Sequence, residues 1–168
     1  ALMRGVIRDM HAAIVNPTDY DARSNLMWAA TMAENRILKL GKKTDFEAHQ
    51  IEHQLGAFTG CNHGCGRAVS HPVYCRHICE AGAKKFARFA TRVWGIPAAG
   101  KDDVTLAHES VEALAAFIRE IGMPTTLREL GMTDDSPLRE IADSCNLMPG
   151  SYKHMTHDEI YEILKECW

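Results

Sequence analysis

The chain has 168 residues, of which 46% are hydrophobic and 24% are charged, a composition typical of a globular domain rather than a disordered segment. Its formal net charge of −3 lacks the bulk positive charge that nucleic-acid binding favours. No apolar run approaches the roughly 20 residues that cross a bilayer, and no basic start followed by an apolar stretch indicates a signal peptide. We therefore expect a cytoplasmic domain that binds neither nucleic acid nor membrane.

Helical signals dominate the first third of the chain. Apolar residues of segment 1–15 recur near the helical period, and Asn16-Pro17 ends the segment because the residue before a proline disfavours the α region. A second helix is expected over about 19–40, with Gly41 just after its end. The capping-box sequence Thr-Asp-Phe-Glu at 44–47 predicts a third helix from about residue 45.

The remainder of the chain also has a helical pattern and almost no strand signal. Four glycines within residues 56–66 predict a broken, tightly turning segment. Because the connections are short, the expected architecture is a compact all-α bundle of several helices, forming a single domain over 1–168. The later helices are expected over about 73–93, 104–121, 126–130 and 137–146, and from a capping box at 156–159 to about residue 167.

Six cysteines occur without a secretory signal. This combination predicts reduced thiols in a cytosolic protein rather than a disulfide framework. The chain opens with Ala-Leu-Met-Arg, inside a predicted helix and without an initiator methionine. We therefore expect a fragment of a longer protein.

The sequence predicts a functional site at three of the nine histidines. His49 and His53 are four residues apart and share one helix face. His63 follows His49 by fourteen residues, a rise of about 21 Å on one straight helix, which is too far for one ion to contact both. A reversal in the glycine-rich segment would return His63 to face His49. Two imidazoles on facing helices provide half of a metal site suited to iron or zinc.

Three other interpretations of these residues remain open. His49 to His53 matches H-x-x-E-H, the inverted zinc-protease motif in which Glu52 would activate water. A structural zinc site is also conceivable, although its cysteine spacings of four are longer than usual. The histidines and cysteines could instead be structural groups of a non-catalytic helical module. The candidate ligands of the structural zinc site are Cys61, Cys65, Cys75, Cys79, His63 and His77.

The other histidines have no partners that the sequence identifies, and we expect most of them at the surface. They are His11, His71, His77, His108, His154 and His157.

Four ordered segments resemble the iron-containing (group III) alcohol dehydrogenases, in particular the butanol-dehydrogenase-like branch. Residues 16–31 resemble a segment of that family's helical domain, and 48–57 with His63-Gly64 resemble its metal and active-site signature. Residues 88–96 and 122–131 resemble its later helices. The resemblance spans nearly the whole chain, from about residue 1 to 166.

The resemblance implies that this chain is equivalent to the family's C-terminal helical domain. A divalent metal, iron or alternatively zinc, would lie in the cleft facing an N-terminal nucleotide-binding α/β domain. By motif position, His49 and His63 correspond to the last two histidine ligands, and His53 corresponds to a cleft histidine that could relay a proton. The remaining ligands, an Asp and a His, and the glycine-rich phosphate-binding segment would lie upstream of Ala1.

The implied activity is the interconversion of primary alcohols and aldehydes by metal-assisted hydride transfer with NAD(H) or NADP(H). The implied partners are the N-terminal domain of the same protein and a small alcohol or aldehyde. We also expect a homo-oligomer, because the cleft-facing apolar surface of a separate helical domain would be uncovered. We expect the isolated chain to be inactive. Four residues depart from the family's small or aliphatic pattern around His63: Cys61, Cys65, Arg67 and Ser70.

Overall fold

A computed structural model describes all residues, 1–168. It contains eight α-helices, one 3-10 helix (η1), one π-helical turn (η2) and no strand, which confirms the all-α prediction. The elements are α1 (Leu2–Val15), α2 (Tyr20–Glu34), η1 (Ile37–Lys39), α3 (Glu47–Thr59), α4 (His63–Ile78), α5 (Ala83–Phe89), η2 (Ala90–Trp94), α6 (Asp103–Glu120), α7 (Leu138–Ser144) and α8 (His157–Glu166).

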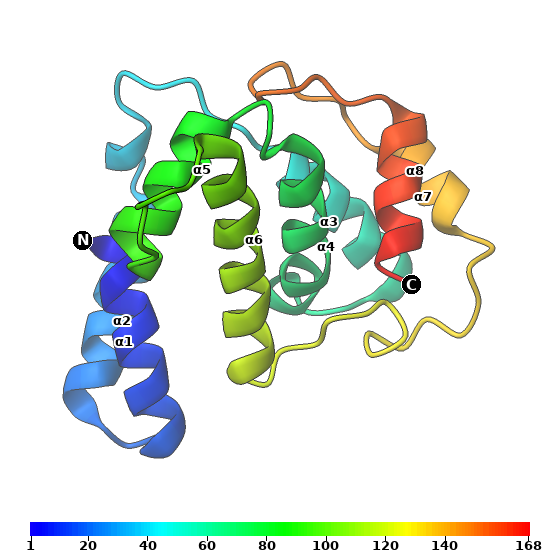
Figure 1. The fold of residues 1–168 in the computed structure, drawn as a ribbon. Helices are drawn as coiled ribbons and strands as arrows, with labels where there is room; N and C mark the ends of the chain where they lie inside the picture. Colours follow the sequence, from blue (N-terminus) through cyan, green and yellow to red (C-terminus); the bar gives the residue numbers. More distant parts are fainter.

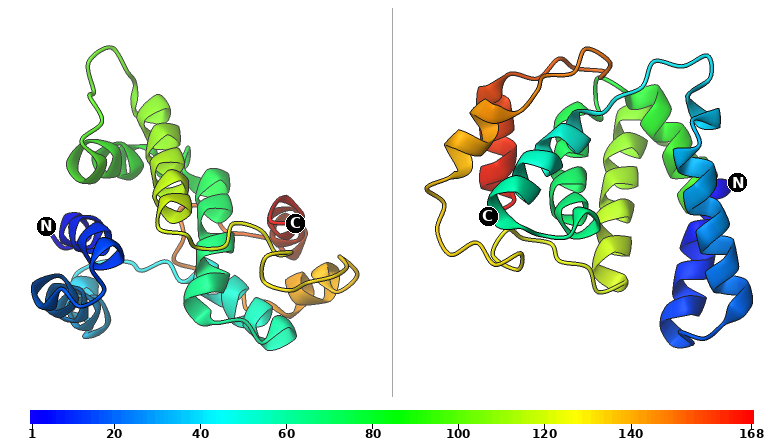
Figure 2. Two further views of the ribbon diagram at one scale, coloured as in Figure 1. Left: turned by 90° about the horizontal axis from the view of Figure 1, so that it is seen from below. Right: turned by 180° about the vertical axis from the view of Figure 1, so that it is seen from behind.

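The helices are arranged from one side of the molecule to the other (Figure 1). An antiparallel α1–α2 hairpin lies at one side, α5 and α6 occupy the middle, and α7 and α8 lie at the opposite side with α3 and α4 between (Figure 2). The hairpin helices pack mainly on each other, whereas α3 contacts both α4 and α7. No helix combines the length and the apolar character that crossing a bilayer requires.

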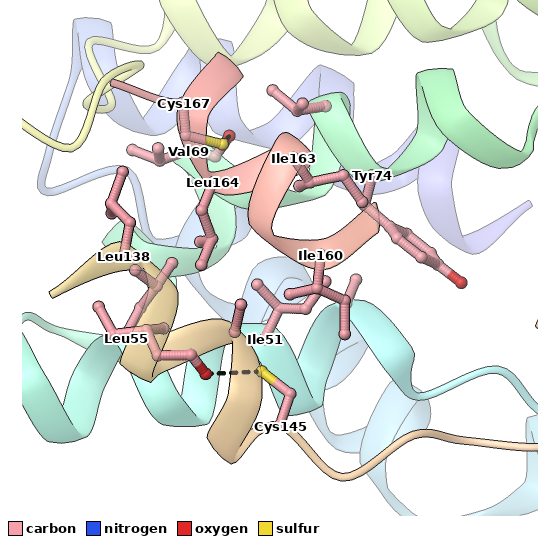
Figure 3. Packing of buried hydrophobic residues seen from close by; sticks show 14 of the residues in the cluster. Ile51, Leu55, Val69, Tyr74, Leu138, Cys145, Ile160, Ile163, Leu164 and Cys167 are labelled. Carbon is pink, nitrogen blue, oxygen red and sulfur yellow. Dashed lines mark hydrogen bonds between the residues drawn. The ribbon is translucent and has the colours of Figure 1, made fainter. Parts of the chain in front are cut away.

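The main core lies where α3, α4, α7 and α8 meet (Figure 3). Helix α8 buries Ile160, Ile163 and Leu164 completely in the same cluster as Ile51 and Leu55 of α3. The predicted capping box at the start of α8 forms in both directions between Thr156 and Glu159. Complete burial of such side chains is worth about 1.5–3 kcal/mol each, so this core stabilises the position of α3, the helix that carries His49 and His53.

The second predicted helix is too long. It ends at Glu34, and a short 3-10 turn follows at Ile37–Lys39. Arg36 lies between them with a φ of +68°, a left-handed conformation that an α-helix cannot continue through. The apolar residues of 37–40 are therefore not part of the α2 face.

The third predicted helix exists but begins later, and its capping box is absent. The helix starts at Glu47 after Phe46, which makes no side-chain cap. Asp45 Oδ1 instead accepts a hydrogen bond from the Glu47 amide (2.9 Å), and Asp45 Oδ2 accepts one from the Tyr74 hydroxyl (2.7 Å). Asp45 therefore provides a local hydrogen bond in place of the capping box, and its second oxygen links the start of α3 to α4.

Two further predictions, the helices expected over 73–93 and 126–130, are wrong. The helix expected over 73–93 begins already at His63, continues through Pro72 and ends at Ile78. A turn over 79–82 separates it from α5 and η2, which cover the rest of the expected range. At Gly82 the Tyr152 ring packs so closely that an added Cβ would lie 2.7 Å from it. The short helix expected at 126–130 is a turn.

Candidate metal centre

The candidate centre lies where the end of α3 meets the start of α4. Gly60 ends α3 with a φ of +67°, a conformation that glycine adopts without strain. The Asn62 side chain then caps α4 by accepting a hydrogen bond from the Gly64 amide (2.9 Å). His63 is the first residue of α4. Only residues 60–62 interrupt the helical conformation. Gly56 lies within α3, and Gly64 and Gly66 lie within α4.

The bend brings three imidazoles together. The ring centroids of His49 and His63 are 4.7 Å apart, which confirms that the reversal returns His63 to His49. The His53 ring lies 4.3 Å from that of His49 and 5.7 Å from that of His63. His53 and His63 are exposed and His49 is half-buried, so one side of this imidazole cluster is open to solvent.

Glu52 is the buried acidic residue beside the imidazole cluster. Its side chain is only 2% exposed, and its Oε2 lies against Nδ1 of His63. That oxygen makes no hydrogen bond, so its contact with His63 is one of proximity and charge. In the sequence Glu52 was a candidate only as the catalytic glutamate of a zinc-protease motif, and its contact with His63 was missed. The signal that could have found it is the pair of glycines, Gly56 and Gly66, that border the carboxylate.

The donor atoms of the cluster are close enough for one cation. Glu52, His53 and His63 can each offer a ligand atom, and these atoms lie within 4.8 Å of one another. His49 is outside this set, although its ring packs on both other imidazoles. Burial, followed by the charges of His53 and His63, lowers the pKa of His49, which favours the neutral form that binds metals. The residues present therefore fit a first-row metal ion.

The cysteines do not form a zinc site. All six are free, and no cysteine belongs to a group of converging ligand atoms. Cys75 and Cys79 are buried and pack among apolar side chains. Cys61 borders Gly66, where an added Cβ would lie 3.2 Å from its Sγ.

A cavity of about 450 Å³ lies beside the cluster and is lined mostly by apolar residues, among them Ala48 and Phe86. None of the three cluster imidazoles lines it. Arg67 and His71 do, and Nη2 of Arg67 contacts Nδ1 of His71. Burial and then the Arg67 charge lower the pKa of His71 to about 3. The expectation of a surface histidine without a partner is therefore wrong for His71.

Four other histidines also have partners that the sequence did not reveal. His11, His77 and His108 each lie within ion-pair distance of a glutamate on another segment, at 2.8–3.1 Å. The His157 ring contacts the carbonyl oxygen of Cys145 (3.1 Å). Long-range pairs of this kind depend on the fold and have no local sequence signal. The three glutamate partners are Glu120, Glu166 and Glu80, respectively.

Comparison with known proteins identifies the family. The C-terminal model of the Fe-containing alcohol dehydrogenase family matches residues 1–168. NADH-dependent butanol dehydrogenase A of Clostridium acetobutylicum is 30% identical over 172 residues, which cover 100% of this chain and 44% of that protein. The NADPH-dependent aldehyde reductase YqhD of Escherichia coli is 32% identical over 131 residues, covering 78% of this chain and 33% of the reductase.

The solved structure of NADH-dependent butanol dehydrogenase A from Thermotoga maritima has the same fold, with a TM-score of 0.89 and 28% identity. The match covers 99% of this chain and 44% of that one. The chain thus spans less than half the length of these relatives. With the family model matching every residue, the chain belongs to the iron-containing alcohol dehydrogenase family and corresponds to its C-terminal helical domain.

Proposed function

We propose that this chain is the metal-site-bearing helical part of an NAD(P)-dependent alcohol dehydrogenase or aldehyde reductase. The whole enzyme would interconvert primary alcohols and aldehydes. The observation that carries the proposal is the convergence of His49, His53 and His63 on one partly open site. The family assignment and the names of the relatives, which include butanol dehydrogenases and an aldehyde reductase, support it.

His49 and His63 are the proposed metal ligands, with iron as the first choice and zinc as the alternative. They come from two helices, and imidazole nitrogen suits either ion. Two histidines leave the coordination of either ion incomplete, and the resemblance assigns the missing Asp and His to a segment upstream of Ala1. When bound, the metal supplies a Lewis acid that polarises a substrate oxygen.

His53 is proposed to move the proton. Its exposed imidazole lies beside that of His49, so it can exchange a proton with water on the open side of the cluster. Imidazole titrates near neutral pH, which suits a group that accepts a proton during alcohol oxidation and returns it during aldehyde reduction. Hydride transfer itself requires NAD(H) or NADP(H), which we assign to the N-terminal nucleotide-binding domain of the same protein.

The alternatives have less support from the site. In the zinc-protease interpretation Glu52 must activate water, but its carboxylate is buried against His63. In a purely structural interpretation, three clustered imidazoles provide no stabilising ion pairs to one another and repel when protonated. A bound cation explains why such groups lie together at a partly open surface.

The isolated chain is proposed to be inactive, because it has two of the four ligands and no nucleotide-binding fold. We also propose that the protein is a homo-oligomer. The hairpin leaves large apolar side chains exposed, including Met27 at 72% and Trp28 at 65%, and association would cover them.

Titration of the purified chain with Zn²⁺ tests the proposed ligands. The variants His49→Ala and His63→Ala should each weaken binding by about tenfold or more. His154→Ala, at an exposed position outside the cluster, is the matched control and should bind as the original chain does. Equal affinity in all four proteins would contradict the proposed site. Reduction of an aldehyde by the isolated chain with NADH or NADPH would contradict its proposed inactivity.

A further inference from the structure

Helix α3 buries two glutamates, and they face different surroundings. Glu47 is fully buried at the start of the helix, where its Oε2 accepts a hydrogen bond from the Met148 amide (2.6 Å). Glu52 is buried further along the helix, where its Oε2 makes no hydrogen bond and lies within ion-pair distance of His63 Nδ1. Burying a carboxylate costs free energy unless a partner compensates. For Glu52 that partner is the imidazole of His63.

The chemistry of imidazole makes this contact informative. A neutral imidazole carries one N–H, and the nitrogen without hydrogen is the one that can bind a metal. A carboxylate only accepts hydrogen bonds, so its proximity to Nδ1 favours the tautomer of His63 that carries the hydrogen on that nitrogen. The lone pair of Nε2 is then free. In water the Nε2–H form of histidine is the more common one, and Glu52 therefore reverses the ordinary preference.

The backbone around Glu52 provides the space that this contact requires. A Cβ on Gly66 would lie 2.9 Å from Glu52 Cγ and 3.0 Å from its Oε1, and a Cβ on Gly56 would lie 3.4 Å from Oε1. Neither glycine has a positive φ, so the backbone conformation does not require glycine at either position. Close approach of the Glu52 side chain is what excludes a larger residue at Gly66.

We propose that Glu52 is a positioning residue, which holds the His63 ring in the tautomer and orientation that leave Nε2 available to a metal ion. A carboxylate that orients a metal-binding histidine is a general feature of metal sites. The importance of this role rests on the proposed function of His63, but the tautomer itself does not depend on it.

The tautomer is measured on the metal-free chain by long-range ¹H–¹⁵N correlation of the histidine rings, at alkaline pH where imidazoles are neutral. We expect the original chain to have the Nδ1–H form at His63, and Glu52→Ala to convert most of it to the Nε2–H form. Glu47→Ala, which also removes a buried carboxylate from α3, should leave the His63 signals unchanged. An Nε2–H ring in the original chain, or no change in Glu52→Ala, would overturn the proposal.

A second variant tests the same proposal if Glu52→Ala does not fold. Gly66→Ala displaces the carboxylate without removing it and should shift the tautomer in the same direction. Gly5→Ala is its control, because a Cβ there meets nothing within 4 Å. If Glu52→Ala cannot be examined, an unchanged His63 tautomer in Gly66→Ala would overturn the proposal.

Metal binding then separates this inference from the function on which it rests. With Zn²⁺ alone as the probe, Glu52→Ala should weaken binding at His63 Nε2 by about 10- to 100-fold, and Glu47→Ala should not. A tautomer change in Glu52→Ala without any loss of Zn²⁺ affinity would overturn the positioning role. If His63→Ala also binds Zn²⁺ normally, the proposed function fails instead, while the tautomer result stands.

Discussion

The two sides of the molecule differ in the degree to which their large apolar side chains are buried. Around α8, side chains such as Ile51 and Leu164 are fully buried in one core. In the α1–α2 hairpin, Met27 and Trp28 remain largely exposed. The imidazole cluster belongs to the first side, since α3 and α4 carry all of its members. Its geometry therefore depends on packing within this chain and not on the hairpin.

Truncation of core and hairpin residues should give the largest contrast between the two sides. Leu164→Ala leaves a cavity in the main core and should lower the free energy of unfolding by about 2–5 kcal/mol. Met27→Ala removes an exposed side chain and should change it by less than about 0.5 kcal/mol. Urea denaturation measures both. Similar losses from the two substitutions would show that the hairpin is packed as tightly as the core.

The pH dependence of stability tests the comparison at the cavity, which is lined by residues from both sides of the molecule. His71 of α4 has a pKa of about 3 in the folded chain, below the value of about 6.5 expected when unfolded. The unfolded chain therefore binds more protons between these values. Stability should decrease as the pH falls through this window, by at most about 1.4 kcal/mol per pH unit.

His71→Gln should remove this part of the pH dependence, because glutamine does not titrate. His154→Gln at an exposed position is the control and should retain the original slope. Thermal or urea unfolding measured across the acidic range provides the comparison. The account of His71 is wrong if the two glutamine variants have the same dependence on pH.

Substitution of two glycines should give the smallest effect. Gly60→Ala forces a side chain into the left-handed turn between α3 and α4 and should cost about 1 kcal/mol. Gly5→Ala in α1 has free space around the new methyl group and should stabilise the helix by up to about 1 kcal/mol. Opposite signs in thermal denaturation are expected, and a loss at Gly5 would mean that α1 is more closely packed than the structure indicates.

Local signals predicted the parts of the fold that depend on local chemistry. The capping box at Thr156, the helix over 103–120 and the glycine bend after α3 follow from patterns a few residues long. The same patterns failed at residues 44–47, where no capping box forms and Asp45 instead accepts hydrogen bonds from the Glu47 amide and the Tyr74 hydroxyl. They also failed at Arg36, which ends the second helix early with no glycine or proline to signal it.

The candidate site was predictable to a similar extent. The spacing of His49, His53 and His63 indicated the cluster, because the bend and the helical repeat together determine where the rings lie. Burial of Glu52 was not predictable, since it depends on how α4 packs over α3. The contact of Arg67 with His71 is a helical i, i+4 pair, but the cavity that both line is formed by distant segments.

The most direct test of the central claim is a crystal structure of the Zn²⁺-loaded chain, with the ion located by anomalous scattering at the zinc edge. The account predicts one dominant ion about 2.0–2.1 Å from imidazole nitrogens of both His49 and His63, with Glu52 on Nδ1 of His63. An ion bound to the cysteine thiols, or one that avoids either of these two histidines, would contradict it.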